Sequence, residues 1–147
     1  MSDHSVDDVA HVYAYIHDQA HLAAYLLLSG DHPLGLLQTY DPAVDEIGRW
    51  YDRAPGDVGV HLLLADDPRR AGRTREVIAA GLDLVAHLPG CRRLVFEPDS
   101  RNTAFGQPAR ASRLRPRPIG RAAHERRGEA GAVLLLDRER ALVLARR

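Results

Sequence analysis

The sequence predicts an α/β (α+β) domain with a mixed central sheet flanked by helices, and two patterns carry this prediction. Residues 24–40 contain two apolar segments around a Ser-Gly-Asp-His-Pro turn, which is typical of a β-hairpin. Residues 55–102 follow the order strand, glycine-containing turn, helix, strand, which is typical of parallel strands joined by a crossover helix. A chain of 147 residues with 45% hydrophobic side chains suits a single domain, residues 1–147, around one core.

The elements ahead of residue 57 follow from hydrophobic spacing and from turn residues. Apolar side chains recur every three or four residues after Val6, so residues 6–28 are predicted to be mainly helical, with Ala24–Leu28 as an alternative start of a strand. The turn at Ser29–Pro33 then predicts that Leu34–Tyr40 is the returning strand of a hairpin. A short helix is expected near Val44–Trp50.

The middle of the chain contains the clearest elements. Val58–Ala65 is an apolar run with one polar member, His61, and it is predicted to be a buried central strand. Asp66-Asp67-Pro68 ends this strand, and Thr74 is a suitable N-cap for a helix that extends to the Pro-Gly pair after residue 88. Leu94–Phe96 is the next predicted strand.

The sequence after residue 102 predicts less regular structure. A helix is expected over Thr103–Ala111, but Gly106 and Pro108 lie inside it, and a proline in a helix interior costs about 3 kcal/mol. Ile119–His124 and Ala132–Leu136 are predicted to pair as a terminal hairpin.

Charge is distributed unevenly along a chain whose formal net charge is zero. Residues 1–60 hold ten acidic and two basic side chains, whereas residues 91–147 hold six acidic and fourteen basic ones, all of them arginine. Beyond residue 100 there is a single aromatic residue, Phe105, so a stacking surface for nucleic acid is lacking and no nucleic-acid partner is expected. No apolar stretch approaches the ~20 residues of a membrane span, and the acidic start is unlike a signal peptide, so a cytoplasmic protein is expected.

Cys91 and two histidines have simple structural interpretations. Cys91 is the sole cysteine, and a small residue at the start of a strand is a simpler interpretation than a thiolate activated by neighbouring arginines. His17 and His21 are one helical turn apart and could share a metal ion, but no cysteine or clear third ligand accompanies them. No metal is therefore expected.

The Arg69–Thr74 turn has the features of a pyrophosphate site. Gly72 allows the backbone to approach a ligand closely, and consecutive N–H groups at the start of a helix suit an anion. Arg69, Arg70 and Arg73 add positive charge. An ordinary basic turn between a strand and a helix is the alternative interpretation.

This segment resembles the acetyl-CoA-binding core of the GNAT superfamily of N-acyltransferases. The string Arg69-Arg70-Ala71-Gly72-Arg73-Thr74 matches the superfamily's pattern (Gln or Arg, two residues, Gly, one residue, Gly or Ala), except that Thr74 holds the last place. Three further strings resemble the branch that acetylates N-hydroxylysine-type amines for hydroxamate siderophores: Pro55-Gly56-Asp57, Gly59-Val60-His61-Leu62 and Glu97-Pro98-Asp99-Ser100-Arg101-Asn102. The resemblance extends from Tyr25 to roughly Arg117.

The resemblance implies a co-substrate, an acceptor and a set of binding residues. The co-substrate is acetyl-CoA or another acyl-CoA, and the acceptor is a small-molecule amine or hydroxylamine. A backbone N–H near Leu63, at a bulge in its strand, is expected to bind the oxyanion that develops during acyl transfer. The implied cofactor-binding residues are Leu63, Arg69, Arg70, Ala71, Gly72, Arg73, Thr74, Asn102 and Phe105.

His61 and Asp99 are the predicted catalytic residues. A histidine buried in an apolar strand is held in its neutral, proton-accepting form, which a general base requires. Asp99 follows a strand at its carboxyl end, where the sites of open α/β sheets lie. A core histidine and a capping aspartate are the alternative interpretations, but the resemblance assigns the acid–base pair of the siderophore branch to these two residues.

Departures from the family leave two functional hypotheses. The family's first strand is expected to be missing, because only a helix precedes the hairpin, and the helix after residue 102 is interrupted. The first hypothesis is an acyl-CoA-dependent N-acyltransferase of siderophore or related secondary-metabolite biosynthesis. The second is a degenerate homologue that binds CoA or a protein partner without catalysis. A missing first strand exposes a sheet edge, so a homodimer that covers this edge is also predicted.

Overall fold

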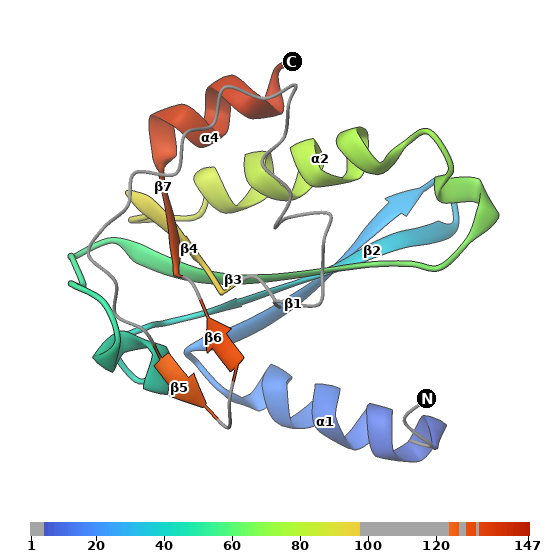
Figure 1. Ribbon diagram of the computed structural model, residues 1–147. Coiled ribbons are helices and arrows are strands. Elements are labelled where there is room, and N and C mark those ends of the chain that lie inside the picture. Colours follow the sequence, from blue (N-terminus) through green and yellow to red (C-terminus); the bar gives the residue numbers. More distant parts are fainter. Residues whose placement is uncertain (1–4, 98–123, 127–128, 132) are drawn as a thin grey trace.

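The computed structural model describes residues 5–97, 124–126, 129–131 and 133–147. A five-stranded mixed sheet of order β1-β2-β3-β4-β7 forms its centre, and β5 and β6 form a separate two-stranded sheet. Figure 1 shows α2 and α4 on one face of the large sheet and α1 on the other, which confirms the predicted fold class. The elements are α1 (Val6–Asp18), β1 (Leu22–Ser29), β2 (His32–Tyr40), β3 (Asp57–Leu64), α2 (Thr74–Ala86), β4 (Arg93–Phe96), β5 (His124–Arg126), β6 (Glu129–Gly131), β7 (Leu134–Asp137) and α4 (Arg138–Ala145), with short 3-10 helices at Glu46–Arg49 and Pro68–Arg70.

The predicted hairpin is formed by β1 and β2 at one edge of the sheet. Antiparallel pairing extends from Leu22 opposite Tyr40 to Ser29 opposite His32, with a register shift between Leu27 and Leu28. Gly30 makes the turn with a φ of 58°, a conformation that glycine adopts without steric cost. Among the described residues β1 has no strand on its outer side, and the predicted dimer across this edge stays a prediction.

The N-terminal helix α1 is shorter than predicted. A capping box between Ser5 and Asp8 starts it, and it ends at Asp18, so residues 22–28 belong to β1. The strand forms there because ladder hydrogen bonds to β2 and the burial of Leu27 outweigh the helical spacing of the alanines. No residue of α1 is buried, and Val12 is 55% exposed, so its apolar face is largely open in the described part of the chain.

The central strand is β3, as predicted, and it extends past its parallel neighbour. It pairs with β2 from Gly59 to Leu64, but with β4 only from Asp57 to Val60. The register with β2 is continuous from Gly59 to Leu64, so this ladder lacks the bulge predicted near Leu63, and the register shift lies in the β1–β2 ladder instead. The β3–β4 pairing ends at Val60 and Phe96, so residues 61–64 of β3 have no described partner on that side.

The main core lies between the sheet and α2. Leu37, Leu94 and Val85 are each no more than 1% exposed in this layer. The even-numbered side chains of β3 from Val58 to Leu64 pack into it. Because side chains alternate along a strand, the odd-numbered residues of β3 lie on the opposite face of the sheet.

The C-terminal elements differ from the predicted terminal hairpin. Residues 134–137 form β7, which pairs with β4, and a small hairpin of β5 and β6 forms inside the segment predicted to be a connection. β7 joins the large sheet because Leu134 and Leu136 pack against the main core while Leu135 packs on the other face. The interrupted helix predicted at Thr103–Ala111 lies outside the described residues. Among the helices that the structure describes, none is long and apolar enough to cross a membrane.

Candidate functional site

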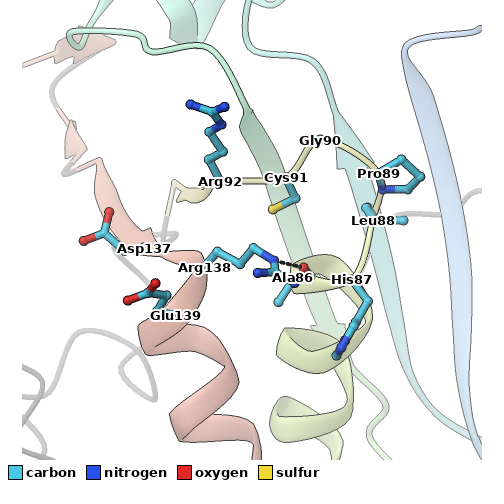
Figure 2. Close-up of a pocket in the computed structure, with 10 residues that line it drawn as sticks. All are labelled: Ala86, His87, Leu88, Pro89, Gly90, Cys91, Arg92, Asp137, Arg138 and Glu139. Carbon is cyan, nitrogen blue, oxygen red and sulfur yellow. Dashed lines mark hydrogen bonds between the residues drawn. The ribbon is translucent and has the colours of Figure 1, made fainter.

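An open pocket of about 670 Å³ lies at the end of α2 that is far from the predicted pyrophosphate turn. Figure 2 shows its walls, which are residues 86–92 after α2 and residues 137–139 at the start of α4. Arg138 donates a hydrogen bond of 2.7 Å to the Ala86 carbonyl there. Cys91 in its wall is 5% exposed, and burial raises the pKa of its thiol, which agrees with a structural role. His61 does not line this pocket.

His61 lies on the face of β3 that points away from α2. It is exposed, whereas Val60 beside it is 3% exposed. The expectation of a buried imidazole is therefore wrong, because residue 61 belongs to the odd-numbered face of the strand. The imidazole is open to a bound molecule, and it lies one residue beyond the last β3–β4 pair, Val60 and Phe96.

The aromatic ring of Tyr40 supports His61 from the neighbouring strand. The two ring centroids are 5.0 Å apart and the ring planes differ by 24°. Gly59 makes room for this arrangement, since a Cβ there would lie 2.2 Å from the Tyr40 ring. Burial, together with the charges of Asp45 and Glu97, raises the pKa of the Tyr40 phenol. Sequence analysis missed this pair. The signal for it was an aromatic residue at the end of one strand, Tyr40, followed by a glycine near the start of the next strand, Gly59.

The backbone of β3 has N–H groups on the side that faces away from β2, but the Leu63 N–H is not one of them. The Ala65 N–H donates to the Leu34 carbonyl in β2 at 3.0 Å, and N–H directions alternate along a strand. The Leu63 N–H therefore also points toward β2. The N–H groups of Leu62 and Leu64 point to the side where β4 has ended.

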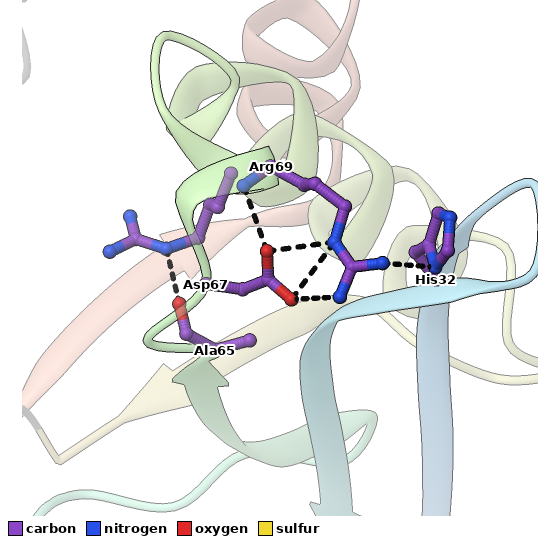
Figure 3. A network of polar contacts seen from close by, with 5 residues as sticks. His32, Ala65, Asp67 and Arg69 are labelled. Carbon is purple, nitrogen blue, oxygen red and sulfur yellow. Dashed lines mark hydrogen bonds and ion pairs between the residues drawn. The ribbon is translucent and has the colours of Figure 1, made fainter.

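The predicted pyrophosphate turn is braced by the hairpin of β1 and β2. Asp67 caps the 3-10 helix Pro68–Arg70 by accepting from the Arg69 N–H at 2.8 Å. The same carboxylate accepts hydrogen bonds from the Arg69 guanidinium, which lower the pKa of Asp67 to about 2. Figure 3 shows that this guanidinium also contacts Nδ1 of His32 in the hairpin, at 2.6 Å. The positive charge of Arg69 is thus already paired within the protein.

The other two arginines of the turn differ in their partners. Arg73 forms an ion pair with Glu76 at 2.8 Å and donates to a hydroxyl at the end of β1. Arg70 donates to the Ala65 carbonyl at 2.6 Å and to the Thr74 hydroxyl at 2.7 Å, both neutral groups. Of the three arginines, Arg70 is therefore the one whose described contacts do not neutralise its charge.

The N-terminus of α2 is open next to this turn. The N-cap is Arg73 and not Thr74 as predicted, and the Arg73 side chain makes no capping hydrogen bond. Thr74 is already helical, and its hydroxyl accepts from Arg70. Gly72 has a φ of 75°, and a Cβ there would meet nothing within 4 Å. A helix start without a side-chain cap leaves backbone N–H groups for an anion.

A buried ion pair, which the sequence analysis missed, holds the loop between β2 and β3. Arg93 donates two hydrogen bonds, of 2.7 and 2.8 Å, to the carboxylate of Asp57, whose side chain is 4% exposed. Tyr51 donates to the same carboxylate at 2.8 Å, and Arg93 also donates to the Asp52 carbonyl. Burial alone would raise the pKa of Asp57, but hydrogen bonds from Arg93, the Ala54 N–H and Tyr51 outweigh it and lower the pKa.

We expect Asp57→Asn to reduce the free energy of unfolding by about 3 kcal/mol at pH 7, because Arg93 is left largely buried without its counter-ion. Since the folded-state pKa of Asp57 is lowered, this stabilisation is present above the ordinary carboxyl pKa of about 3.9 and is lost as the pH falls through the lower folded-state value. Denaturant unfolding of both proteins from pH 7 down to about pH 2.5 measures the effect. The exposed Asp52→Asn variant is the control, and a pH-independent difference for Asp57→Asn would contradict the assignment.

The structure does not place several predicted residues near His61 or the Arg69–Thr74 turn. Asp99, Asn102 and Phe105 lie outside the described residues, and their roles stay predictions. His21 lies between α1 and β1, so it does not share the helix of His17 as predicted. Within the described ranges, no three His, Cys, Asp or Glu side chains form a group that could hold a metal ion.

Sequence comparisons point to one domain family. Residues 1–119 match the acetyltransferase (GNAT) domain family. The lysine N-acyltransferase MbtK of Mycobacterium tuberculosis is 36% identical over 72 residues, a match that covers 48% of this chain and 34% of that protein. The chain thus aligns with about a third of the length of this curated relative.

Solved structures share the fold at low sequence identity. An uncharacterised protein from Bacillus halodurans has a TM-score of 0.71 and 18% identity, over 96% of this chain and 71% of that chain. The aminoglycoside acetyltransferase AAC(6')-Ib in complex with coenzyme A and kanamycin has a TM-score of 0.67 and 18% identity, over 99% of this chain and 84% of that chain. At this level of identity the likeness establishes the fold.

Proposed function

The chain belongs to the acetyltransferase (GNAT) family, and from this premise we propose that it transfers an acetyl or another short acyl group from acyl-CoA to the nitrogen of an amine or hydroxylamine. The partial likeness to a lysine N-acyltransferase supports a nitrogen acceptor on a small molecule. A role in siderophore or related secondary-metabolite biosynthesis is the finer part of the proposal. It is supported by the strings Gly59–Leu62 and Glu97–Asn102, which resemble that branch.

One structural observation carries the proposal: β3 extends from His61 beyond the end of β4 and leads into the uncapped start of α2. This segment presents, in order, a histidine, backbone N–H groups without a partner strand among the described residues, and a proposed anion site. A pyrophosphate at the Gly72 turn and a thioester near His61 would be joined by the extended arm of CoA along the side of β3 that faces away from β2. The N–H groups of Leu62 and Leu64 lie on that side.

In the proposed mechanism the acceptor nitrogen attacks the thioester carbon directly. His61 takes the proton that the nitrogen loses, and the N–H groups of β3 that face away from β2 stabilise the negative charge on the carbonyl oxygen. The carbon–sulfur bond then breaks, and the CoA thiolate leaves and takes up a proton. Asp99 is proposed to orient His61 or the acceptor. Much of the acceleration comes from holding the two reactants together, so no covalent enzyme intermediate is required.

The proposed CoA site is centred on the start of α2. The backbone N–H groups after Gly72 bind the pyrophosphate, and Arg70 supplies the positive charge that no carboxylate neutralises in the described structure. Arg69 and Arg73 hold the turn in shape through their own ion pairs. Asn102 is assigned to CoA by the resemblance of its string to the family, and Phe105 because it lies nearby in sequence.

A non-catalytic CoA-binding protein is the second candidate, and one observation favours it. Among the described residues no strand lies outside β1, so the first strand of the family is not seen there. The two candidates differ in turnover and agree in CoA binding.

Product analysis separates these candidates. The protein is incubated with acetyl-CoA and longer acyl-CoAs, each with lysine, N-hydroxylysine or an aminoglycoside, and products are identified by mass spectrometry while free thiol is measured. We expect an N-acylated product and free CoA in equal amounts for at least one pair. Binding of CoA without any acylated product would support the second candidate, and absence of CoA binding would reject both.

A further inference from the structure

We propose that Tyr40 is a positioning residue for His61: its ring holds the imidazole beside the end of the β3–β4 ladder in the orientation that proton transfer requires. This inference rests on the proposed role of His61 as the base. It assigns a part in the reaction to a residue in β2, outside both the pyrophosphate turn and the Glu97–Asn102 string.

The strand register places the two rings together. Tyr40 lies opposite Gly59 in the β2–β3 ladder, so His61 is its diagonal neighbour on the same face. The centroid distance of 5.0 Å and the small interplanar angle of 24° describe stacked rings. Such a contact restricts rotation of the imidazole about its side-chain bonds, because other rotamers lose the stacking.

In this stack the buried ring of Tyr40 contacts the exposed ring of His61. Tyr40 is 7% exposed and packs with Ile47 and Val95 in a cluster on this face of the sheet. His61 is exposed, and an exposed side chain loses conformational entropy when a reaction requires one orientation. Contact with the fixed Tyr40 ring reduces this loss. Gly59 is part of the arrangement, because any Cβ there would displace the ring.

The phenol hydroxyl has no part in this role. It is buried and has no hydrogen-bond partner among the described residues. Burial also raises the pKa of the phenol, so Tyr40 stays protonated and cannot itself accept the acceptor's proton. Phenylalanine therefore preserves everything that the inference needs, and Tyr40→Phe is the conservative variant.

A double-mutant cycle tests the inference. Tyr40→Phe, Tyr40→Leu and His61→Ala are compared, together with the double variant Tyr40→Leu/His61→Ala, for kcat, for KM of the acyl-CoA and for melting temperature. We expect Tyr40→Phe to stay within about twofold of wild type, and Tyr40→Leu to lower kcat by roughly tenfold to a hundredfold with KM of the acyl-CoA unchanged. Once His61 is absent, Tyr40→Leu should have no further effect on kcat.

Four outcomes would overturn it. If Tyr40→Leu lowers kcat equally with and without His61, the Tyr40 ring contributes only to packing. If folded Tyr40→Leu keeps the wild-type kcat, the ring does not position His61. Equal loss from Tyr40→Phe and Tyr40→Leu would assign the role to the hydroxyl. Wild-type turnover in His61→Ala would overturn the proposed base as well, so the two failures can be told apart.

A second measurement does not depend on the stability of Tyr40→Leu. In wild type and in Tyr40→Phe, the imidazole protons of His61 should resonate upfield of an unstacked histidine, because they lie over an aromatic ring. Gly59→Ala should remove this shift and lower kcat together, since the added Cβ displaces the Tyr40 ring. Unshifted His61 resonances in the wild-type protein would contradict the stack, and with it the inference.

Discussion

His61→Ala should lower kcat by at least about a hundredfold and leave the affinity for CoA unchanged. Positioned general bases contribute about 10²–10⁴-fold, and the His61 imidazole is proposed to contact the acceptor nitrogen and not the CoA phosphates. It lies on β3 next to the end of the β4 ladder, several residues before the turn proposed to bind the pyrophosphate. Steady-state kinetics measure the first part of this prediction and calorimetry with CoA the second.

A matched histidine variant makes the same prediction sharper. A general base must be present to take the proton of the acceptor, so kcat should fall only when the His61 imidazole is removed. His87→Ala is a matched control, because His87 is also exposed but follows α2 at the far pocket. Wild-type rates in a folded His61→Ala protein would remove this histidine from the mechanism.

The identity of β3 could be predicted from sequence, but the direction of its histidine could not. The run from Val58 to Ala65 is apolar at nearly every position, which suggested burial on both faces. In the structure one face is open, and Leu63 is 52% exposed on it. Because Leu63 is apolar although it is exposed, the run lacks the alternation of polar and apolar residues that marks an open face. The sequence therefore could not show that the His61 imidazole lies on that face.

Long-range pairing explains the other differences. Arg93 and Asp57 are opposite each other in the β3–β4 ladder, but 36 residues separate them, so their ion pair becomes visible only once the register is known. Leu134–Asp137 similarly joins β4 and not the nearer segment that sequence spacing suggested. Hydrophobic patterns identify such strands, whereas their partners depend on how the whole sheet assembles.

Within the turn proposed to bind the pyrophosphate, the local sequence held more information than was used. Glu76 follows Arg73 by three residues, a spacing at which a carboxylate can reach a guanidinium on a helix. Asp67 precedes Arg69 by two residues and pairs with it at the start of the short 3-10 helix. Those two arginines are paired in the structure, and Arg70 is left without a carboxylate partner among the described residues. Counting arginines alone therefore overestimates the charge available to a ligand.

Gly72→Val should weaken CoA binding by at least about tenfold, because the new side chain would project into the space proposed for the pyrophosphate and would strain the backbone. Gly72 has a φ of 75° with open space at its Cβ position, and side chains other than glycine cost roughly 1–2 kcal/mol in such a conformation. Gly90 is a matched control at the other end of α2, with a φ of 76° and nothing within 4 Å of a Cβ.

Melting temperature and calorimetry on the two variants separate the effect of backbone strain on stability from the effect of the added side chain on CoA binding. Gly72→Val and Gly90→Val should lose similar stability, because both place a β-branched residue in the same backbone conformation. Only Gly72→Val should lose affinity for CoA, because only its side chain lies at the uncapped start of α2. Equal affinity of two folded variants for CoA would place the pyrophosphate away from this turn, since the position of the added side chain is the main difference between them.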